Sequence, residues 1–377
     1  MTDDAFAVLE PGDPAPWFAQ RSDVNARFQF HTAGGRTLVL CFYGAAKDPH
    51  AQAAIAYALA SPLFDDRRAA FFGVSAAPDD ETNGLAKSRM PGVRHFFDGD
   101  RTIARLYGAC PSAGPGALRR RWVVIDPAMR VLAVIPFAED RADIAAVDAV
   151  LRQAPPAGVA AGIAVEAPAL VLPRVFESGL CDALIAHYEA QGGTESGFMR
   201  DVDGKTTMLM DHRHKRRRDA AVDDAGLRAA IQDRIRRRVL PALARAYQFA
   251  ATRMERYIVA CYDADDAAHF NPHRDNTTKG TAHRKFAVSL LLNDAYEGGG
   301  LYFPEYGTKT YKPEPGAAIV FSCSLLHAVT PVTRGRRYAF LPFLYDDAGA
   351  AVRLDANAHL DAAVPAYGRP TPAAPAS

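Results

Sequence analysis

Two histidines and an aspartate have the residue types and the spacing of a metal site. His273 and Asp275 are separated by one residue, and His327 follows 52 positions after Asp275. In an extended segment, residues i and i+2 point to the same side, so His273 and Asp275 are able to reach a single ion. Two imidazoles and one carboxylate on one face of Fe(II) form the ligand set of non-haem iron oxygenases, which leaves the other positions open for reactants. The sequence therefore predicts an iron site at these three residues, the iron triad.

The alternative is that these are ordinary surface or buried side chains, because a His-x-Asp triplet with a distant histidine is common by chance. The neighbouring segments favour the metal site. A strand-like run at residues 257–262 precedes the triplet, a glycine turn lies at residues 297–300, and the apolar run 317–322 leads into His327. These segments supply, in order, the strands that two distant ligand positions require.

Short strand-like runs dominate the second half of the chain, after two helical stretches. Turns rich in Gly and Pro, such as Pro313-Glu-Pro-Gly316, separate the runs. Short strands with such turns are typical of a β-sandwich or jelly roll. We predict strands at residues 255–262, 285–292, 300–303, 317–322 and 337–345, and helices at residues 178–192, with Ser178 as N-cap, and 223–248.

This half of the chain resembles the prolyl-hydroxylase-like branch of the 2-oxoglutarate/Fe(II)-dependent dioxygenases. The resemblance covers about residues 168–347. It implies a double-stranded β-helix, which is a jelly-roll barrel with supporting helices, and a hydroxylase that uses Fe(II), 2-oxoglutarate as co-substrate and O2, with ascorbate as reductant. The motifs that carry it are Tyr257-Ile-Val-Ala-Cys-Tyr262, His273-Arg-Asp275, Leu326-His327-Ala-Val-Thr and Gly335-Arg-Arg-Tyr338.

The resemblance also implies a role for each motif residue. The iron triad matches the metal ligands of the family. Arg337 matches the basic residue that holds the far carboxylate of 2-oxoglutarate, for which a guanidinium fork is suited, and Arg336 is the alternative. Tyr262 matches a tyrosine whose hydroxyl reaches the same carboxylate. Thr330 is a candidate for supporting the triad from close by.

The implied reaction is the oxidative decarboxylation of 2-oxoglutarate to succinate and CO2, coupled to hydroxylation of a C–H bond. Related halogenating enzymes have a small residue at the position of Asp275, so the carboxylate favours hydroxylation. The substrate stays open between a peptide, an amino acid and a small metabolite, because the family shares its cofactor site and varies its loops. We expect substrate contacts in residues 196–219 and in the loop at residues 263–271.

A basic run at residues 213–218 has two interpretations. The default interpretation is a solvated charged surface. The functional alternative is a loop that contacts an anionic or peptide substrate. His269 and His283 lie near the triad in sequence. We expect them to be loop or supporting histidines rather than metal ligands.

The first half of the chain alternates strand-like and helix-like segments, which predicts a central sheet flanked by helices. Strands are expected at residues 37–43, 69–75, 121–126 and 132–137, and helices at residues 51–63 and 140–153. Residues 8–150 resemble a peroxiredoxin, which implies a thioredoxin-like fold. The motifs include Pro11-Gly-Asp-Pro14, Phe97-Asp-Gly-Asp100 and Arg121-Trp-Val-Val-Ile-Asp126.

The peroxidatic motif of that family is absent from this chain. A Thr-x-x-Cys sequence supplies the thiolate nucleophile, and the corresponding stretch here is Asp48-Pro-His-Ala51. Cys41 lies within a predicted strand, and Cys110 lies in a predicted loop with no identified partner. We therefore expect a binding, docking or structural role, such as contact with a protein partner. The alternative is that a redox-sensing or thiol function of this domain is the main activity of the chain.

A chain of 377 residues exceeds what one hydrophobic core organises. We predict a peroxiredoxin-like domain at residues 1–152 and a dioxygenase domain at residues 168–350. Residues 153–167 are rich in Ala, Pro and Gly, which is typical of a linker. Residues 351–377 have a similar composition and are expected to form a loosely held tail.

Composition and charge exclude several classes of partner. The formal net charge of +1 gives no overall field that favours nucleic acid, and no apolar run is long enough for a membrane span. The five cysteines are scattered without CxxC spacing, which fits a reducing compartment, and the N-terminus lacks the layout of a signal peptide. We expect a cytoplasmic protein with a small-molecule or peptide substrate, and the sequence leaves the oligomeric state open.

Overall fold

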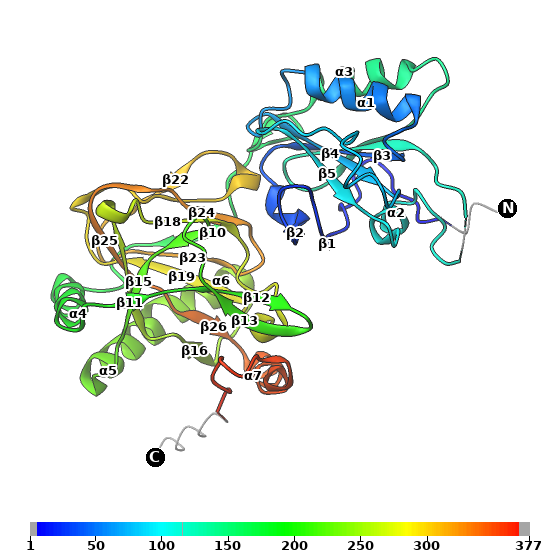
Figure 1. Cartoon of the computed structure of the whole chain (residues 1–377). Helices are drawn as coiled ribbons and strands as arrows, with labels where there is room; N and C mark the ends of the chain where they lie inside the picture. Colours follow the sequence, from blue (N-terminus) through cyan, green and yellow to red (C-terminus); the bar gives the residue numbers. More distant parts are fainter. Residues whose placement is uncertain (1–5, 115, 369–377) are drawn as a thin grey trace. The chain divides into compact units, whose positions relative to one another are not determined.

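The computed structural model describes residues 6–114 and 116–368, and it divides into two compact units (Figure 1). One unit comprises Met1–Glu166 with Pro304–Thr308, and the other comprises Ala167–Phe303 with Lys309–Ser377. Each unit has its own hydrophobic core. Among the described residues, no helix combines the length and the apolar character that crossing a membrane requires.

A five-stranded sheet forms the centre of the N-terminal unit, in the order β5-β4-β3-β6-β7. Strands β3, β4 and β5 are parallel, β6 is antiparallel to β3, and β7 is antiparallel to β6. The four predicted strands are confirmed. The fifth, β5, escapes prediction because Arg94 and His95 interrupt its short apolar run. The strands are β3 (Thr37–Gly44), β4 (Ala69–Ser75), β5 (Val93–Phe97), β6 (Arg121–Ile125) and β7 (Val131–Pro136), with a small pair β1 (Ala19–Gln20) and β2 (Phe28–Gln29).

Helices cover both faces of this sheet (Figure 1). On one face, Ile55 and Leu151 from two helices pack with Val39 and Trp122 of the sheet, and on the other face a third helix packs through Ile103. Burial of both faces explains why these strands are almost continuously apolar. The helices are α1 (Pro49–Ala60), α2 (Thr102–Leu106) and α3 (Ala142–Gln153). The predicted thioredoxin-like fold of this unit is confirmed.

The C-terminal unit is built from a larger and a smaller sheet that together line one cavity. The larger has the order β10-β23-β19-β25-β17-β15-β11, with β16, β20 and β26 joined to it, and the smaller has the order β14-β18-β24-β21-β22. Two sheets around a common interior form the predicted jelly roll. The larger sheet contains β10 (Ala169–Leu172), β11 (Thr194–Glu195), β15 (Arg218–Ala221), β16 (Arg253–Glu255), β17 (Ile258–Asp263), β19 (Phe286–Leu291), β20 (Tyr296–Gly298), β23 (Ala318–Ser322), β25 (Val332–Phe340) and β26 (Phe343–Tyr345). The smaller contains β14 (Lys215–Arg216), β18 (His269–His273), β21 (Leu301–Tyr302), β22 (Thr310–Tyr311) and β24 (His327–Val329).

Helices support the larger sheet on its outer face, where Leu184 and Ile231 pack with Val259 and Phe340. Alternation along each strand sends every second side chain to this core and the others toward the cavity. The predicted helix at residues 223–248 is interrupted by a π turn at Ile235–Val239. The helices are α4 (Ser178–Gln191), α5 (Ala225–Arg234) and α6 (Leu240–Tyr247).

The predicted N-cap at Ser178 is wrong. Glu177 is the N-cap of α4, and its side chain makes no capping hydrogen bond. Its carboxylate instead pairs with Arg234 and Arg238 on the neighbouring helical segment. A tertiary ion pair has therefore replaced the local capping interaction that the sequence suggests.

The expectation of a loosely held tail is wrong for the described part of residues 351–377. Helix α7 (Asp347–Asp355) is followed by a short 3-10 turn, Ala356–His359. Leu360 is 8% exposed and forms a β-bridge with Thr206, while Asn357 and Tyr367 exchange hydrogen bonds. A few apolar and amide side chains anchor a segment whose Ala/Pro-rich composition suggests otherwise. Within residues 153–167, a two-residue hairpin forms from β8 (Val159–Ala160) and β9 (Ile163–Ala164).

Candidate metal centre

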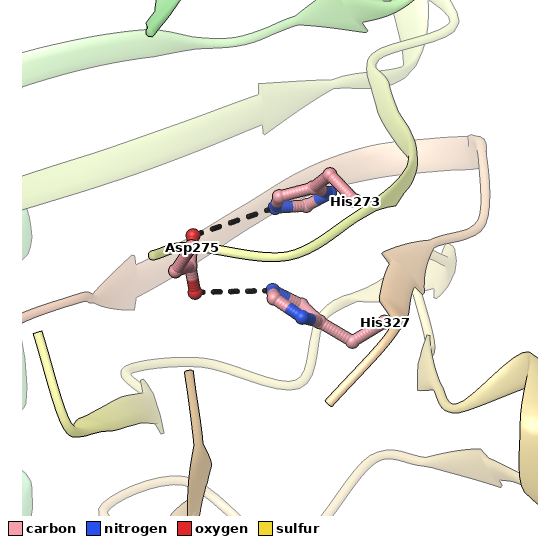
Figure 2. Close-up of side chains that lie close together, drawn as sticks. All are labelled: His273, Asp275 and His327. Atoms are coloured by element: carbon pink, nitrogen blue, oxygen red, sulfur yellow. Dashed lines mark ion pairs between the residues drawn. The ribbon is translucent and has the colours of Figure 1, made fainter. Parts of the chain in front are cut away.

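The structure brings His273, Asp275 and His327 together, with their polar atoms pointing at a common centre (Figure 2). The Nε2 atom of His273 lies 3.6 Å from Oδ1 of Asp275, and Nε2 of His327 lies 3.3 Å from Oδ2 of the same carboxylate. Ligands about 2.1 Å from an ion at right angles are about 3 Å apart. One ligand atom of each residue lies within 4.8 Å of the other two, so the iron triad is close enough for its three side chains to share one ion.

Two neighbouring strands of the smaller sheet position the triad. His273 ends β18, His327 begins β24, and the two residues are direct partners in the antiparallel pairing. Asp275 lies just beyond β18, where its backbone N–H donates to the carbonyl of Cys323 at 2.9 Å. The pairing of two strands that are distant in sequence thus fixes the separation of the two imidazoles.

Backbone carbonyls orient both imidazole rings. The Nδ1 atom of His273 lies 2.8 Å from the carbonyl oxygen of Asn271, and Nδ1 of His327 lies 3.0 Å from that of Leu325. An Nδ1–H that donates to a carbonyl leaves the lone pair on Nε2, which is the atom that faces Asp275. Both histidines are therefore set in the tautomer that a metal ligand requires.

Charge in the centre suits a divalent cation. Burial and the neighbouring His327 lower the pKa of His273 well below its usual range, so its ring is neutral at pH 7. Burial alone would raise the pKa of Asp275, but His327 and His273 reverse this and keep it below its usual range. A neutral imidazole beside an ionised carboxylate is the form that binds a metal ion.

Arg337 lies in the same cavity, on β25 of the larger sheet. The residue is 2% exposed, and its Nη2 donates to the hydroxyl of Ser289 at 3.2 Å. Its Nε and Nη1 atoms have no hydrogen-bond partner among the described residues. A buried guanidinium without a counter-charge costs several kcal/mol, so this position is built to receive an anion.

Tyr262 lies beside Arg337, whereas Arg336 lies on the opposite face of the strand. Tyr262 is the strand partner of Arg337, and its ring centroid lies 4.9 Å from the Arg337 guanidinium carbon. Its hydroxyl accepts a hydrogen bond from Nη1 of Arg217 at 3.5 Å. Arg336 points to the opposite face, where it pairs with Asp263 at 2.7 Å. Of the two adjacent arginines, only Arg337 lines the cavity.

The basic run at residues 213–218 divides between surface and interior. Arg213 has an exposed side chain, whereas Lys215 and Arg217 are buried. Arg217 lines the cavity together with Arg256, which the sequence did not single out. In a strand, alternate side chains point to opposite faces, so a predicted strand would have separated the buried Lys215 and Arg217 from their exposed neighbours. Strands β14 and β15 are too short to be predicted from the sequence.

His269, His283 and Thr330 do not belong to the group of side chains that could hold the metal. His269 contacts the carbonyls of Ala267 and Arg213, and His283 is fully buried beside Glu255. Thr330 accepts a hydrogen bond from Gly300 N–H at 2.9 Å, which ties β24 to the turn before β21. These residues support the strands around the centre rather than the centre itself.

In the N-terminal unit, an ion pair occupies the position of the missing thiol motif. Asp48 caps α1 by accepting from the N–H groups of His50 and Ala51, and it also pairs with Arg120 at 2.7 Å. Ala51, at the position of the family cysteine, is buried. The beginning of α1 therefore has a buried methyl group at the position of the nucleophilic thiol and a carboxylate at the position of the threonine.

We predict that the native chain reacts with less than one equivalent of Ellman's reagent and does not accelerate peroxide consumption. All five cysteines are buried and none is in a disulfide, and burial raises the pKa of Cys41 and Cys323 well above the usual range. A protonated, inaccessible thiol is a poor nucleophile. Thiol titration in buffer and in denaturant, where all five should react, measures the difference. Rapid native labelling with peroxide turnover would contradict the prediction.

The sequence matches two family profiles. The profile described as the 2OG-Fe(II) oxygenase superfamily matches residues 257–345, and that of the AhpC/TSA family matches residues 11–134. A PKHD-type hydroxylase of Azoarcus sp. (strain BH72) is 31% identical over 174 residues, which are 43% of this chain and 75% of that protein. A PKHD-type hydroxylase of Nitrosomonas europaea is 32% identical over 122 residues, which are 29% of this chain and 54% of that protein.

Solved structures with similarity to each unit are also known. A prolyl hydroxylase from Trichoplax adhaerens, in complex with a hypoxia inducible factor peptide fragment, has 18% identity and a TM-score of 0.40 and covers 49% of this chain and 86% of its own. The peroxidoxin BcpB from Mycobacterium tuberculosis has 24% identity and a TM-score of 0.34 and covers 39% of this chain and 98% of its own.

Proposed function

Because the chain belongs, through its C-terminal unit, to the PKHD-type hydroxylases of the 2OG-Fe(II) oxygenase superfamily, we propose that it hydroxylates a C–H bond of a peptide, amino acid or small metabolite. Its activity is that of a dioxygenase that uses Fe(II), 2-oxoglutarate and O2. In this proposal the iron triad holds the metal, Arg337 holds the far carboxylate of 2-oxoglutarate, and ascorbate keeps the iron reduced.

The observation that carries the proposal is the unsatisfied guanidinium of Arg337 in the same cavity as the triad. A metal site alone fits many reactions, whereas a metal site with a buried anion receptor fits a metal-chelating co-substrate that has a second carboxylate. The unsatisfied N–H groups of this buried, permanently charged guanidinium suit the oxygens of a carboxylate. Bound 2-oxoglutarate would thus satisfy both the open metal positions and the buried charge.

Different residues of the cavity have different roles in the proposed reaction. When bound, Fe(II) supplies the redox chemistry that activates O2. The triad leaves one side of the metal open, Arg337 orients the co-substrate, and Ser289 and the Tyr262 ring hold the Arg337 side chain in place. Apolar walls that include Leu301 and Phe321 exclude water from the reacting atoms.

The alternative, a thiol or redox-sensing function of the N-terminal unit, has less support. Ala51 stands at the nucleophile position, and Asp48 occupies the nearby guanidinium of Arg120. We assign this unit a binding or docking role toward a protein partner. We also propose a cytoplasmic location, which the scattered cysteines without CxxC spacing support.

Succinate formation tests the proposed function. The purified full-length chain, given 2-oxoglutarate, ascorbate and O2, is expected to form succinate only when Fe(II) is added, even without substrate and at a slow uncoupled rate. Treatment with a chelator should abolish the reaction, and added Fe(II) should restore it. The proposal fails if no Fe(II)-dependent succinate forms and 2-oxoglutarate shows no metal-dependent binding.

Replacing Arg337 by Gln should weaken 2-oxoglutarate binding on the order of 100-fold or more. Loss of a charge-assisted buried pair typically costs about 3–5 kcal/mol. Isothermal titration of the Mn(II)-loaded protein under argon measures this affinity without turnover. Arg336→Gln is the matched control, because it removes a neighbouring arginine on the other face of β25, and it should change the affinity less than threefold. Equal affinities for the two variants would remove Arg337 from the co-substrate site.

A further inference from the structure

The cavity contains a cation that neither the metal nor the co-substrate explains. Arg256 lies between β16 and β17 and lines the same cavity as the iron triad, together with Arg217 and Phe343. Its guanidinium carbon lies 5.3 Å from the Phe343 ring centroid, and its side chain is 28% exposed. The guanidinium of Arg256 therefore lies against an apolar wall of the cavity that it lines.

The backbone at Arg256 is strained in a way that fixes this position. Its φ angle is +66°, in the left-handed region that residues other than glycine and asparagine seldom adopt. Such a conformation persists only where the surrounding structure imposes it, and it clusters at functional sites. Here the flanking strands impose it, because β16 pairs with β26 while β17 pairs with β15 and β25.

The nearest carboxylate, Asp219, is already used by other groups. Arg217 donates Nε to Oδ1 and Nη2 to Oδ2 of Asp219, both at 2.7 Å, and the Ser196 hydroxyl donates to Oδ2 at 2.6 Å. Arg256 donates a longer hydrogen bond from Nη2 to Oδ2, at 3.4 Å. Asp219 therefore pairs most closely with Arg217. The amine of Lys215 lies 2.8 Å from the Ser196 hydroxyl, and burial and the charge of Arg217 lower its pKa well below the usual range, so it is not counted as a further cation.

This arrangement leaves positive charge in excess. Burial and the charge of Arg217 lower the pKa of Arg256 to about 10, as expected for a cation that lacks adequate compensation. Asp275 also acts on Arg256, but its carboxylate belongs to the metal centre. The charge of Arg256 is thus available for an anion that enters beside the metal.

We propose that Arg256 binds a carboxylate of the primary substrate, so that the molecule hydroxylated by this protein is a carboxylic acid. The inference rests on the proposed function and specifies the substrate class of the same site. Each arginine then binds one of the two acids. Arg337, on β25, binds 2-oxoglutarate, and Arg256, beside Phe343, binds the substrate. Arg217 has a positioning role, because it fixes Asp219 behind Arg256.

Acetate and its neutral isostere acetamide are the probes that test this assignment. In the Mn(II)-loaded chain saturated with 2-oxoglutarate, the bound metal enhances the proton relaxation of a methyl group that resides in the cavity. We expect saturable enhancement for acetate and none for acetamide. Arg256→Gln should weaken the acetate effect at least tenfold, Arg256→Lys should retain part of it, and Arg253→Gln, a nearby arginine that pairs with Asp347, should behave as wild type.

Three outcomes would overturn the inference. They are an acetate effect that is equal in wild type and Arg256→Gln, an acetamide effect that equals that of acetate, and no saturable acetate effect at all. Arg256→Gln should bind 2-oxoglutarate with wild-type affinity, and a loss there would assign Arg256 to the co-substrate instead. If the wild type itself neither binds nor consumes 2-oxoglutarate, the proposed function fails rather than this inference.

A second experiment, which measures turnover, shows whether the substrate carboxylate belongs to a free amino acid or to the C-terminus of a peptide. Free amino acids, dipeptides with a free C-terminus, and the amidated form of each are compared for stimulation of succinate formation. Stimulation by acids and loss of at least tenfold in kcat/KM on amidation are expected. Amides that stimulate as well as their acids would contradict the assignment.

Discussion

Asp275→Ala is expected to abolish Fe(II)-dependent succinate formation, to below one hundredth of the wild-type rate. Asp275 is the only anionic member of the iron triad and faces both imidazole Nε2 atoms, at 3.6 and 3.3 Å. Its removal leaves two neutral ligands and no negative charge to offset a divalent ion. The loss should therefore appear both in turnover and in the affinity for Fe(II), which anaerobic titration measures.

Asp182→Ala is a matched control for this variant. Asp182 is exposed on α4, and its side chain does not line the cavity. Its replacement should leave succinate formation within twofold of wild type. Retention of a tenth or more of the wild-type rate by the Asp275 variant would exclude the carboxylate as an essential ligand.

Glu255→Gln is expected to lower the stability of the C-terminal unit by about 3–5 kcal/mol, which lowers its melting temperature by about 10 °C. Glu255 is 7% exposed, and it pairs with Arg284 at 2.7 Å and with Arg353 at 3.1 Å. His283 Nε2 lies 3.1 Å from the same carboxylate, an ion-pair distance without hydrogen-bond alignment. Glutamine keeps the shape of the side chain but leaves the largely buried guanidinium of Arg284 without its counter-charge.

The pH dependence of this contribution follows from the direction of the shift. Burial alone would raise the pKa of Glu255, but Arg284 and His283 reverse this, so that the folded-state value lies below the unfolded one. The stabilisation is therefore complete above the unfolded pKa of about 4.3 and disappears as the pH falls toward the folded-state pKa. Thermal melts at pH 7 and pH 3 should show a smaller difference between wild type and variant at the lower pH.

Glu314→Gln provides the comparison, since Glu314 is exposed and removal of its charge should change the melting temperature by less than about 2 °C. The transition of the N-terminal unit should be unchanged in both variants. A Glu255 variant as stable as wild type at pH 7 would show that the surrounding cations are solvated rather than dependent on this carboxylate.

Local periodicity and motif order predicted the parts of the molecule that depend on short segments. The i, i+2 spacing of His273 and Asp275 brings both side chains to one centre, as the structure has it. Likewise, alternation along β25 separates Arg337 from Arg336. These features depend on the two-residue period of a strand, which is visible in the sequence. The predicted strand at residues 317–322 does not itself carry the distant imidazole, because β23 ends at a turn and His327 begins the separate strand β24 of the smaller sheet.

Features that depend on tertiary context were not predictable in the same way. Arg256 draws attention because it lines the cavity while Asp219, the carboxylate beside it, is already paired with Arg217. Neither fact follows from a local sequence pattern. The anchoring of Leu360 on Thr206 similarly joins segments that are far apart in the sequence. Charge compensation and long-range packing are properties of the folded chain. The sequence composition therefore predicted neither the role of Arg256 nor the packing of Leu360.

The Asp48–Arg120 pair has a consequence for any attempt to restore peroxidase chemistry. A cysteine introduced at position 51 would lie beside a carboxylate, which disfavours the thiolate, while the guanidinium that could stabilise it is engaged at 2.7 Å. Ala51→Cys alone should therefore yield an inert thiol. Reversal requires that Asp48 be neutralised at the same time, and two simultaneous changes are a much rarer event than one. The ion pair at the beginning of α1 therefore disfavours a reactive cysteine at position 51, even if the residue itself is restored.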